Sequence, residues 1–274
     1  MRDPRLTIMI TALAAMAGAA AELAAADTKD GLEWSVSLGS TVTFAMPSFE
    51  DRWSVLVADP FPSFIFSESA RYTPVNPLGV NVGAQMWLPF GLGFFAEYQR
   101  HVQDVPSRIV SEAALGEGVA FLEGRLDTEK FERNETRFHV GVGYRIRAGS
   151  DGYFEVSGGA SRVSFKQDLA REIGIHIDIF RQDCPAGAVR CTIEIEIEQR
   201  EPQKGSTWGV NAGAGFVRFF NKNVGIGAQV RYSKGGAVEL RGLEAFDEEG
   251  NQYRNRFKVK TEAVTAGVSL KVRF

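Results

Sequence analysis

Apolar and polar residues alternate one by one along many stretches of this chain, most clearly in the last one. In residues 266–274, AGVSLKVRF, every second side chain from Val268 to Phe274 is apolar, and small or charged residues lie between them. A period of two predicts a β-strand with one apolar and one polar face. The alternation slips by one near Ala263 and Val264, which predicts a β-bulge.

The same period returns in seven earlier segments, and the connections between the segments alternate in length. Turns of a few residues, such as PFG and AGSDG, join segments two and three, four and five, and six and seven. Eight strands joined in this way predict an all-β fold, a closed antiparallel barrel. The segments are 34–46, 78–88, 92–99, 137–147, 153–161, 208–216 and 224–232, and the long connections span roughly 47–77, 102–133, 167–205 and 235–256.

The N-terminus indicates export. Arg2 and Arg5 precede an apolar run at 6–21, and small residues follow it at A-x-A spacing, ending at Ala26. This layout predicts a cleaved signal peptide over 1–26, which leaves 27–274 as one barrel domain. A sheet in hydrocarbon must close to pair its edges. We therefore expect a transmembrane barrel with short periplasmic turns, long extracellular loops and an aromatic girdle near the turns: Trp34, Trp87, Phe90, Tyr153, Phe219, Phe220 and Phe274.

The eight segments, the motif LPFGLGFFAEYQ at 88–99 and the ending VSLKVRF resemble the small eight-stranded outer-membrane barrels, the OmpA/OmpX-like group. The resemblance implies a monomer in the outer membrane of a Gram-negative bacterium, in contact with its lipid and lipopolysaccharide. It also implies that the last strand is the signal read by the barrel-assembly machinery, through Val268, Leu270, Val272 and Phe274. The family is functionally mixed, so the resemblance predicts the fold better than the function.

With the apolar face outward, the polar face of each strand lines the barrel interior. If the AGSDG turn is centred on Ser150, Arg145 faces Glu155, which predicts a cross-strand salt bridge. Buried charges need partners, so we expect these residues to plug the barrel. The alternative is a narrow, porin-like pore that prefers anions, because basic residues are in excess. The predicted interior network is Glu97, Arg137, His139, Arg145, Arg147, Glu155, Arg231, Lys271 and Arg273.

The third long connection contains two alternating runs, at 172–180 and 192–200, around Cys184 and Cys191. In an oxidising compartment two cysteines this close are expected to form a disulfide. We expect a hairpin that extends the barrel wall and is stapled at its tip. The alternative is that the two runs are further membrane strands, which would give ten in all.

Candidate chemistry is sparse. Net charge is −3, which gives no indication of nucleic acid as a partner. No metal or cofactor motif is present, so no cofactor is expected. His101 lies near Asp104 and His176 near Asp178, but neither pair has a nucleophile beside it. We expect a non-enzymatic, surface-exposed protein that acts in envelope integrity, or in adhesion to a host or matrix ligand through its loops. An enzyme at the barrel rim remains an alternative.

Overall fold

The computed structural model describes residues 31–44, 46–57, 64–115, 121–176, 190–246 and 252–274. The predicted signal peptide, residues 1–26, lies outside these ranges. Within them, ten β-strands form a single sheet. No helix among the described residues is long and apolar enough to cross a membrane. The strands are β1 Glu33–Phe44, β2 Phe49–Val57, β3 Phe64–Tyr72, β4 Leu78–Trp87, β5 Leu92–Leu115, β6 Phe121–Arg147, β7 Gly152–His176, β8 Arg190–Phe219, β9 Val224–Phe246 and β10 Gln252–Arg273.

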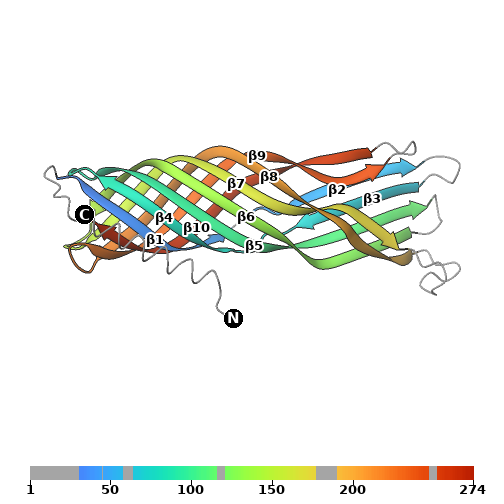
Figure 1. Cartoon of the computed structure of the whole chain (residues 1–274), viewed down its shortest axis with the longest axis horizontal. Helices are drawn as coiled ribbons and strands as arrows, with labels where there is room; N and C mark the ends of the chain where they lie inside the picture. Colours follow the sequence, from blue (N-terminus) through green and yellow to red (C-terminus); the bar gives the residue numbers. More distant parts are fainter. Residues whose placement is uncertain (1–30, 45, 58–63, 116–120, 177–189, 247–251) are drawn as a thin grey trace.

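Eight of the strands close into a ring, as the alternation predicted. They pair antiparallel in the order β1–β4–β5–β6–β7–β8–β9–β10, and β10 pairs back with β1. In the closing pair Val36 faces Val272, and the Phe274 N–H donates to the Trp34 carbonyl at 2.9 Å. Figure 1 shows this barrel-like tube at the end of the molecule that holds the C-terminus.

Tight turns join the strands at that end. The turn after β4 is closed by a hydrogen bond from the Gly91 N–H to the Leu88 carbonyl at 2.9 Å. Gly91 has φ +90° and Gly149, in the turn after β6, has φ +80°. Residues with a Cβ atom rarely adopt such positive φ angles. The PFG and AGSDG turns predicted from the sequence therefore need glycine at these two positions.

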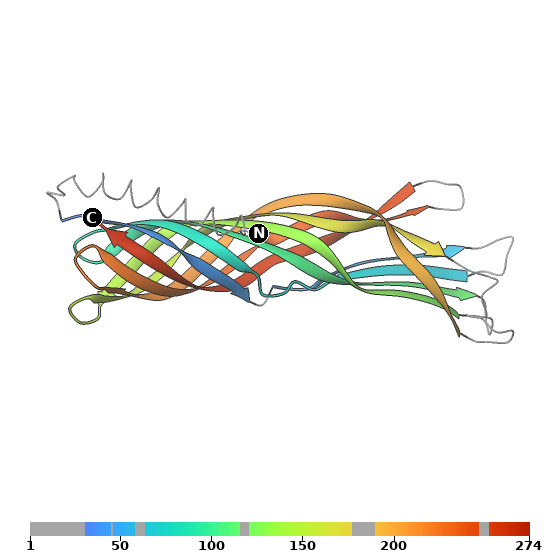
Figure 2. The same ribbon diagram turned by 60° about the horizontal axis from the view of Figure 1, so that its bottom comes forward.

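The predicted long loops are mostly strand, which corrects the sequence-based prediction. β5 and β6 stay paired from Leu92 opposite Tyr144 to Ala114 opposite Phe121. β2 and β3 form a hairpin, and β3 pairs with the distal part of β5. Figure 2 shows these strands running on together, away from the short turns. We call residues 33–44, 78–99, 137–161, 207–233 and 263–274 the ring. We call the described residues within 49–72, 100–136, 162–206 and 234–262 the tower.

The predicted count of eight barrel strands is confirmed for the ring, but the sheet of the described residues has ten strands in all. The ten-strand alternative placed extra strands at 172–180 and 192–200, but the described parts of those runs are the distal ends of β7 and β8. The hairpin interpretation of these runs is confirmed as far as His176 opposite Glu194. The two strands outside the ring are β2 and β3, from the first predicted loop.

Polarity reverses between ring and tower. On β5, Phe94 and Tyr98 point outward and are exposed in the ring, whereas Val105 and Ile109 point inward and are fully buried in the tower. The tower therefore has an apolar core, formed by Phe49, Ala70, Tyr72, Val105, Ile109, Phe131, Phe165, Leu169, Ala170, Ile195, Val238, Leu240, Leu243 and Val259.

The reversal of polarity between ring and tower also explains why the apolar–polar alternation slips by one residue in β10. The β9–β10 register shifts between Lys260 and Glu262, close to the predicted bulge. The inside–outside alternation nevertheless continues unbroken, with Thr261, Ala263 and Thr265 all buried. What changes at this point is which face of β10 carries the apolar side chains.

The tower wall has a seam. Among the described residues no backbone ladder joins β2 to β10. Side chains close the gap instead: Asp51 accepts hydrogen bonds from the Leu243 N–H and the Asn255 amide, both at 2.5 Å. A Cβ on Gly242 would lie 1.9 Å from the Asp51 carboxylate. The missing side chain at Gly242 therefore makes room for the Asp51 contact.

Candidate functional site: outward band and filled lumen

A continuous apolar band surrounds the ring. Its outward residues occupy 138–146 of β6, 224–232 of β9 and 264–272 of β10. Each of these runs matches the roughly 9–11 residues that a tilted transmembrane strand needs. On the tower side the outward residues become polar or charged at once, with Arg100 after Tyr98 and Lys234 after Tyr232. The exposed members of the band include Phe94, Phe138, Val142, Ile146, Phe154, Val156, Val210, Ile226, Val230, Val268 and Leu270.

Aromatic side chains gather at both borders of this band. Trp34, Phe90 and Tyr144 are exposed near the short turns, and Trp208 and Tyr232 are exposed near the tower. Tryptophan and tyrosine favour membrane interfaces because their rings are apolar with one polar group. The band thus has the width and the borders of a bilayer-facing surface.

Part of the predicted girdle faces the other way. Trp87 and Phe219 are buried inside the ring, because odd-numbered residues of β4 and β8 point inward. Tyr153 is half-buried and its ring lies 4.8 Å from the Arg145 guanidinium carbon. These three aromatics line the lumen near the short turns and do not belong to the outer border.

The lumen of the ring is filled by polar side chains, centred on Glu97. One Glu97 carboxylate oxygen accepts from the Arg231 guanidinium at 3.0 Å. The other accepts from the Gln99 and Gln229 amides, both at 2.7 Å. Arg231 also donates to the Asn211 side-chain oxygen at 2.6 Å. Glu97 and Arg231 are both buried, and their charges are paired across the lumen.

The predicted pairing of Arg145 with Glu155 is half right. The two residues are cross-strand neighbours, as the turn predicted. Their charges, however, pair elsewhere: Arg145 binds Glu33, and Glu155 accepts from Lys271 at 2.7 Å. These partners lie on other strands of the ring and reach across the narrow lumen.

One predicted member, Arg147, lies outside the network, and another, Arg273, joins it at the rim through Glu33, which Arg145 also binds. Arg147 is exposed and donates to the carbonyls of Gly149 and Ser150, because it ends β6 beside the turn. Arg273 lies half-buried at the short-turn rim, where it packs over the Phe219 ring at 4.0 Å and pairs with Glu33 at 3.7 Å.

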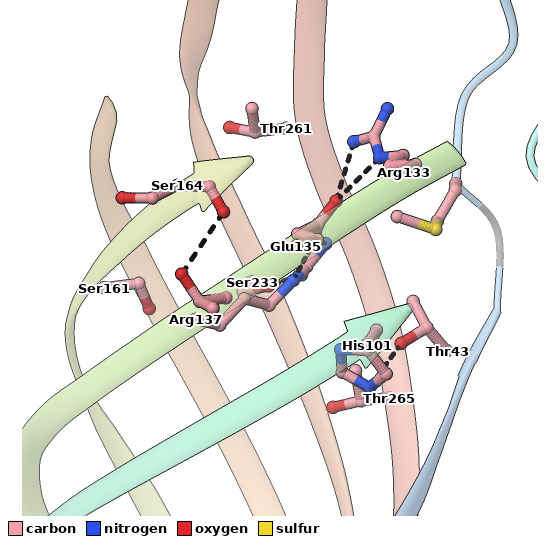
Figure 3. A network of polar contacts seen from close by, with 12 residues as sticks. Thr43, His101, Arg133, Glu135, Arg137, Ser161, Ser164, Ser233, Thr261 and Thr265 are labelled. Atoms are coloured by element: carbon pink, nitrogen blue, oxygen red, sulfur yellow. Dashed lines mark hydrogen bonds and ion pairs between the residues drawn. The ribbon is translucent and has the colours of Figure 1, made fainter. Parts of the chain in front are cut away.

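A second polar layer separates the lumen from the tower core (Figure 3). Arg133, Glu135 and Arg137 lie in a row along β6, each almost fully buried. Glu135 accepts from Arg133 at 2.6 Å and from Arg137 at 2.6 Å, and Arg137 donates to Ser233 at 2.5 Å. Only Arg137 was predicted here. The alternating charges of Arg133, Glu135 and Arg137 are visible in the sequence and are the signal that was missed.

Two histidines, His101 and His139, belong to the same layer. His101 points inward and its Nε2 lies 3.0 Å from the hydroxyls of Thr41 and Thr43, whereas Asp104 points outward. The two side chains, which are near each other in sequence, therefore do not form a pair. His139 lies 2.6 Å from the Ser161 hydroxyl, and both are completely buried. A substrate has no access to this serine, so the contact is a packing interaction.

The remaining free space in the lumen is small. A cavity of about 20 Å³ lies among Gln85, Trp87, Glu155, Arg231 and Lys271. This volume holds about one water molecule. Above it lie the Arg133–Glu135–Arg137 layer and then the apolar tower core. In the described part of the chain, paired polar side chains and then apolar ones occupy the interior along the barrel axis.

The remaining predicted site residues are those of the C-terminal assembly signal, the disulfide and the His176–Asp178 pair. Val268 and Leu270 are exposed on the closing strand, while Val272 and Phe274 are half-buried. Their role as an assembly signal stays a prediction. The predicted disulfide lies outside the described residues, because Cys184 is not described and Cys191 is described only as backbone of β8. The same holds for the side chains of the His176–Asp178 pair. The described residues contain no cluster suited to a metal ion.

Comparison with solved structures finds outer-membrane β-barrels at low identity. The chain is similar to small outer-membrane β-barrels. The attachment invasion locus protein Ail of Yersinia pestis aligns over 89% of this chain and 99% of its own, with 14% identity and a TM-score of 0.41. Neisserial surface protein A aligns over 89% and 96%, with 11% identity and a TM-score of 0.36. The outer membrane protease OmpT of Escherichia coli aligns over 90% and 98%, with 11% identity and a TM-score of 0.37.

No protein family and no curated protein matches the sequence. At the identities and TM-scores of the solved structures, similarity carries no functional argument. The fold therefore rests on the strand pairing described above, and function has to be inferred from the residues of this chain.

Proposed function

We propose that this protein is an integral outer-membrane β-barrel of a Gram-negative bacterium, with the ring in the membrane and the tower on the cell surface. The observation that carries the proposal is the apolar band, bordered by aromatic residues and ending where the tower core begins. Only hydrocarbon outside the ring and water outside the tower account for both surfaces at once. Lipid and lipopolysaccharide then surround the ring.

The short turns would face the periplasm and the tower the exterior. This orientation follows the usual asymmetry of outer-membrane barrels, in which the periplasmic connections are short. The closing β1–β10 pair supports insertion as a single-chain monomer by the barrel-assembly machinery, since the ring needs no second chain to pair its edges.

The tower supports a role in surface binding, such as adhesion to a host or matrix component, and in envelope integrity. The tower part of β8 spans 190–206, which is roughly 50 Å of strand at about 3.3 Å per residue. Such a rigid extension holds its tip well away from the membrane surface. No catalytic role is part of the proposal, because the one close Ser–His contact described is sealed from substrate.

Shortening the tower tests this role. Replacing residues 171–200 by a tight turn is expected to leave ring assembly intact, measured by heat-modifiable migration in gels. Adhesion of cells carrying the shortened protein to immobilised matrix proteins is expected to fall to background. Unchanged adhesion by cells with the shortened protein would rule out binding through this part of the tower. If intact protein confers no adhesion, increased detergent sensitivity of cells lacking it is the expected sign of the envelope role.

The narrow anion-preferring pore is the weaker candidate. The sealed layer at Glu135 and the small cavity below it support a silent barrel. Planar-bilayer recordings of the refolded protein are therefore expected to show no discrete conductance steps. Reproducible anion-selective steps would contradict this expectation and would favour the pore.

A further inference from the structure

The small cavity in the lumen of the ring exists because glycines line it. Its volume is about 20 Å³, and Gly213 and Gly227 belong to its lining. A Cβ on Gly213 would lie 3.1 Å from the Ser157 Oγ and 3.4 Å from the Arg231 Cζ. A Cβ on Gly227 would lie 3.3 Å from the Ser269 Oγ. Even one methyl group at either position would therefore take up part of the cavity.

The polar groups that remain free at the cavity are hydrogen-bond donors. Arg231 is almost fully buried, and its Nε has no hydrogen-bond partner among the described residues, whereas both of its Nη atoms already donate. Lys271 uses two of its three protons to donate to Gln85 and Glu155, both at 2.7 Å. One oxygen of Gln85 and one of Glu155 are thereby occupied, while Arg231 and Lys271 each keep an N–H to offer.

The charges of the lumen are not balanced. At each end, among the described residues, one carboxylate is shared by two arginines. The shared carboxylates are Glu33, with Arg145 and Arg273 at the short-turn rim, and Glu135, with Arg133 and Arg137 on the tower side. Between these ends Glu97 pairs with Arg231, and Glu155 pairs with Lys271, so neither pair offsets the excess.

The cavity lies between these two positive ends. Trp87, which belongs to its lining, has the Arg145 guanidinium carbon 5.1 Å from its ring centre. On the tower side, Arg137 donates to Ser233, which lies two residues beyond Arg231 on β9. Net charge in a buried, poorly solvated region is costly, so a single negative charge at the cavity would stabilise the ring.

We propose that this cavity binds one chloride ion. The Arg231 Nε–H and the third Lys271 proton are its charged donors, and the hydroxyls of Ser157 and Ser269 can turn to donate as well. A chloride ion is only slightly larger than a water molecule, whereas sulfate, phosphate and organic carboxylates are too large for this volume. Metal cations such as calcium and magnesium require oxygen ligands, which the free donors of this cavity do not supply.

Anomalous diffraction locates the ion directly. Crystals of the full chain are grown in sodium bromide, because bromide takes the place of chloride and is detected at its absorption edge. The expected result is an anomalous peak inside the cavity, in contact with the Arg231 Nε. A cavity without anomalous signal would assign the space to water. Peaks on the protein surface alone would show an adventitious ion only, and either of these results would overturn the inference.

The salt dependence of unfolding provides a second test. Urea unfolding of the full chain in detergent micelles is compared in sodium chloride and in sodium gluconate at equal ionic strength, since gluconate is too large for the cavity. Chloride at roughly ten times its dissociation constant should raise the ratio of folded to unfolded protein about tenfold.

A pair of matched variants links this salt effect to the cavity. Gly227→Ala places a methyl group in the cavity and is expected to abolish the difference between the two salts. The control is Gly158→Ala, whose Cβ would meet only the Asn211 carbonyl, at 3.5 Å, and which is expected to keep the difference. Equal stability of the unaltered chain in both salts would contradict the inference, and so would a chloride effect that survives in the Gly227 variant.

Discussion

In the ring, Val142 points outward and Glu97 points inward; in the tower, charged side chains such as Lys130 cover the surface and Phe131 fills the interior. The same strands build both regions, so backbone geometry does not account for the difference. The difference follows from what surrounds each region. An apolar outer wall is stable when hydrocarbon surrounds it, and a polar wall around an apolar core is stable when water surrounds it. Under the proposed function, the level at which the two patterns exchange would mark the outer surface of the membrane.

The two regions also hold together in different ways. The ring is closed by backbone ladders on every side, and its interior is a set of paired charges. The tower has an apolar core, and at the β2–β10 seam the Asp51 side chain takes the place of a ladder. Substitutions are therefore expected to act differently in the two regions, and four comparisons test this, from the largest expected effect to the smallest.

Loss of the buried acid between ring and tower is expected to be the most damaging change. Glu135→Ala leaves Arg133 and Arg137 buried without their shared partner, which should lower the free energy of unfolding by about 3–5 kcal/mol. The control on the same strand is Glu129→Ala, which removes an exposed partner of Arg200 and should cost about 0–1 kcal/mol. Urea unfolding in lipid vesicles measures both, and equal losses would contradict the importance of burial.

The two faces of β6 provide the next comparison. Phe131→Ala opens a cavity in the tower core and should cost about 3–5 kcal/mol. Its effect is expected in the tower alone, seen as faster proteolysis of tower segments with the ring still protected. Phe138→Ala, on the lipid-facing side, should leave tower proteolysis unchanged. Faster cleavage in the Phe138 variant would show that the regions are not separated as described.

A charge placed on the outer wall distinguishes hydrocarbon from water. Val142→Arg, in the middle of the band, should lower the free energy of unfolding in vesicles by about 2–4 kcal/mol. Val102→Arg, on the outward face of β5 just beyond the band, should change it by less than about 0.5 kcal/mol. If both substitutions cost the same, the border of the band does not lie between Tyr98 and Val102.

The tower alone is expected to respond to mild changes of pH. Burial raises the pKa of the Glu68 carboxyl from 4.5 to about 7, and the nearby Asp51 charge acts in the same direction against a hydrogen bond from Trp53. Because the folded pKa is the higher one, the folded tower binds the proton more tightly. The Glu68 contribution to tower stability is fully present below pH 4.5 and is lost as the pH rises through 7, by up to about 3 kcal/mol.

The variant Glu68→Gln removes this titration. Urea unfolding of the tower, followed by Trp53 fluorescence between pH 4 and about 8, should show the unaltered chain losing stability relative to the variant as the pH rises. Parallel curves would mean that Glu68 does not govern the response. If the unaltered chain instead lost stability relative to the variant as the pH falls, the sign would be opposite and would contradict a raised Glu68 pKa.

Sequence reasoning recovered the ring because its alternation is simple. The eight segments, their short turns and the register of Arg145 with Glu155 all follow from local pattern. The ion pairs do not, since Lys271 and Glu155 meet across the lumen from strands far apart in the chain. Such partners depend on closure of the whole ring.

The tower was missed for a physical reason. The alternation continues beyond residue 100, but the apolar positions move from the even to the odd residues of β5, as at Val105 and Ile109. Numerous charged residues on the outward face make such segments resemble polar loops. An analysis that tracked the even-numbered and odd-numbered positions separately would not have needed the apolar face to stay outward. It would have extended β5 through Ile109 and towards Ala113.

The most direct test of the account is a depth profile along the outward face of β6. Single spin labels at residues 142, 138, 134 and 130, in a background with Cys184 and Cys191 replaced, report whether each site collides with oxygen in lipid or with a nickel complex in water. The account predicts lipid exposure at 142 and 138 and water exposure at 134 and 130. Water exposure at 142, or lipid exposure continuing to 130, would contradict a membrane surface at the border of ring and tower.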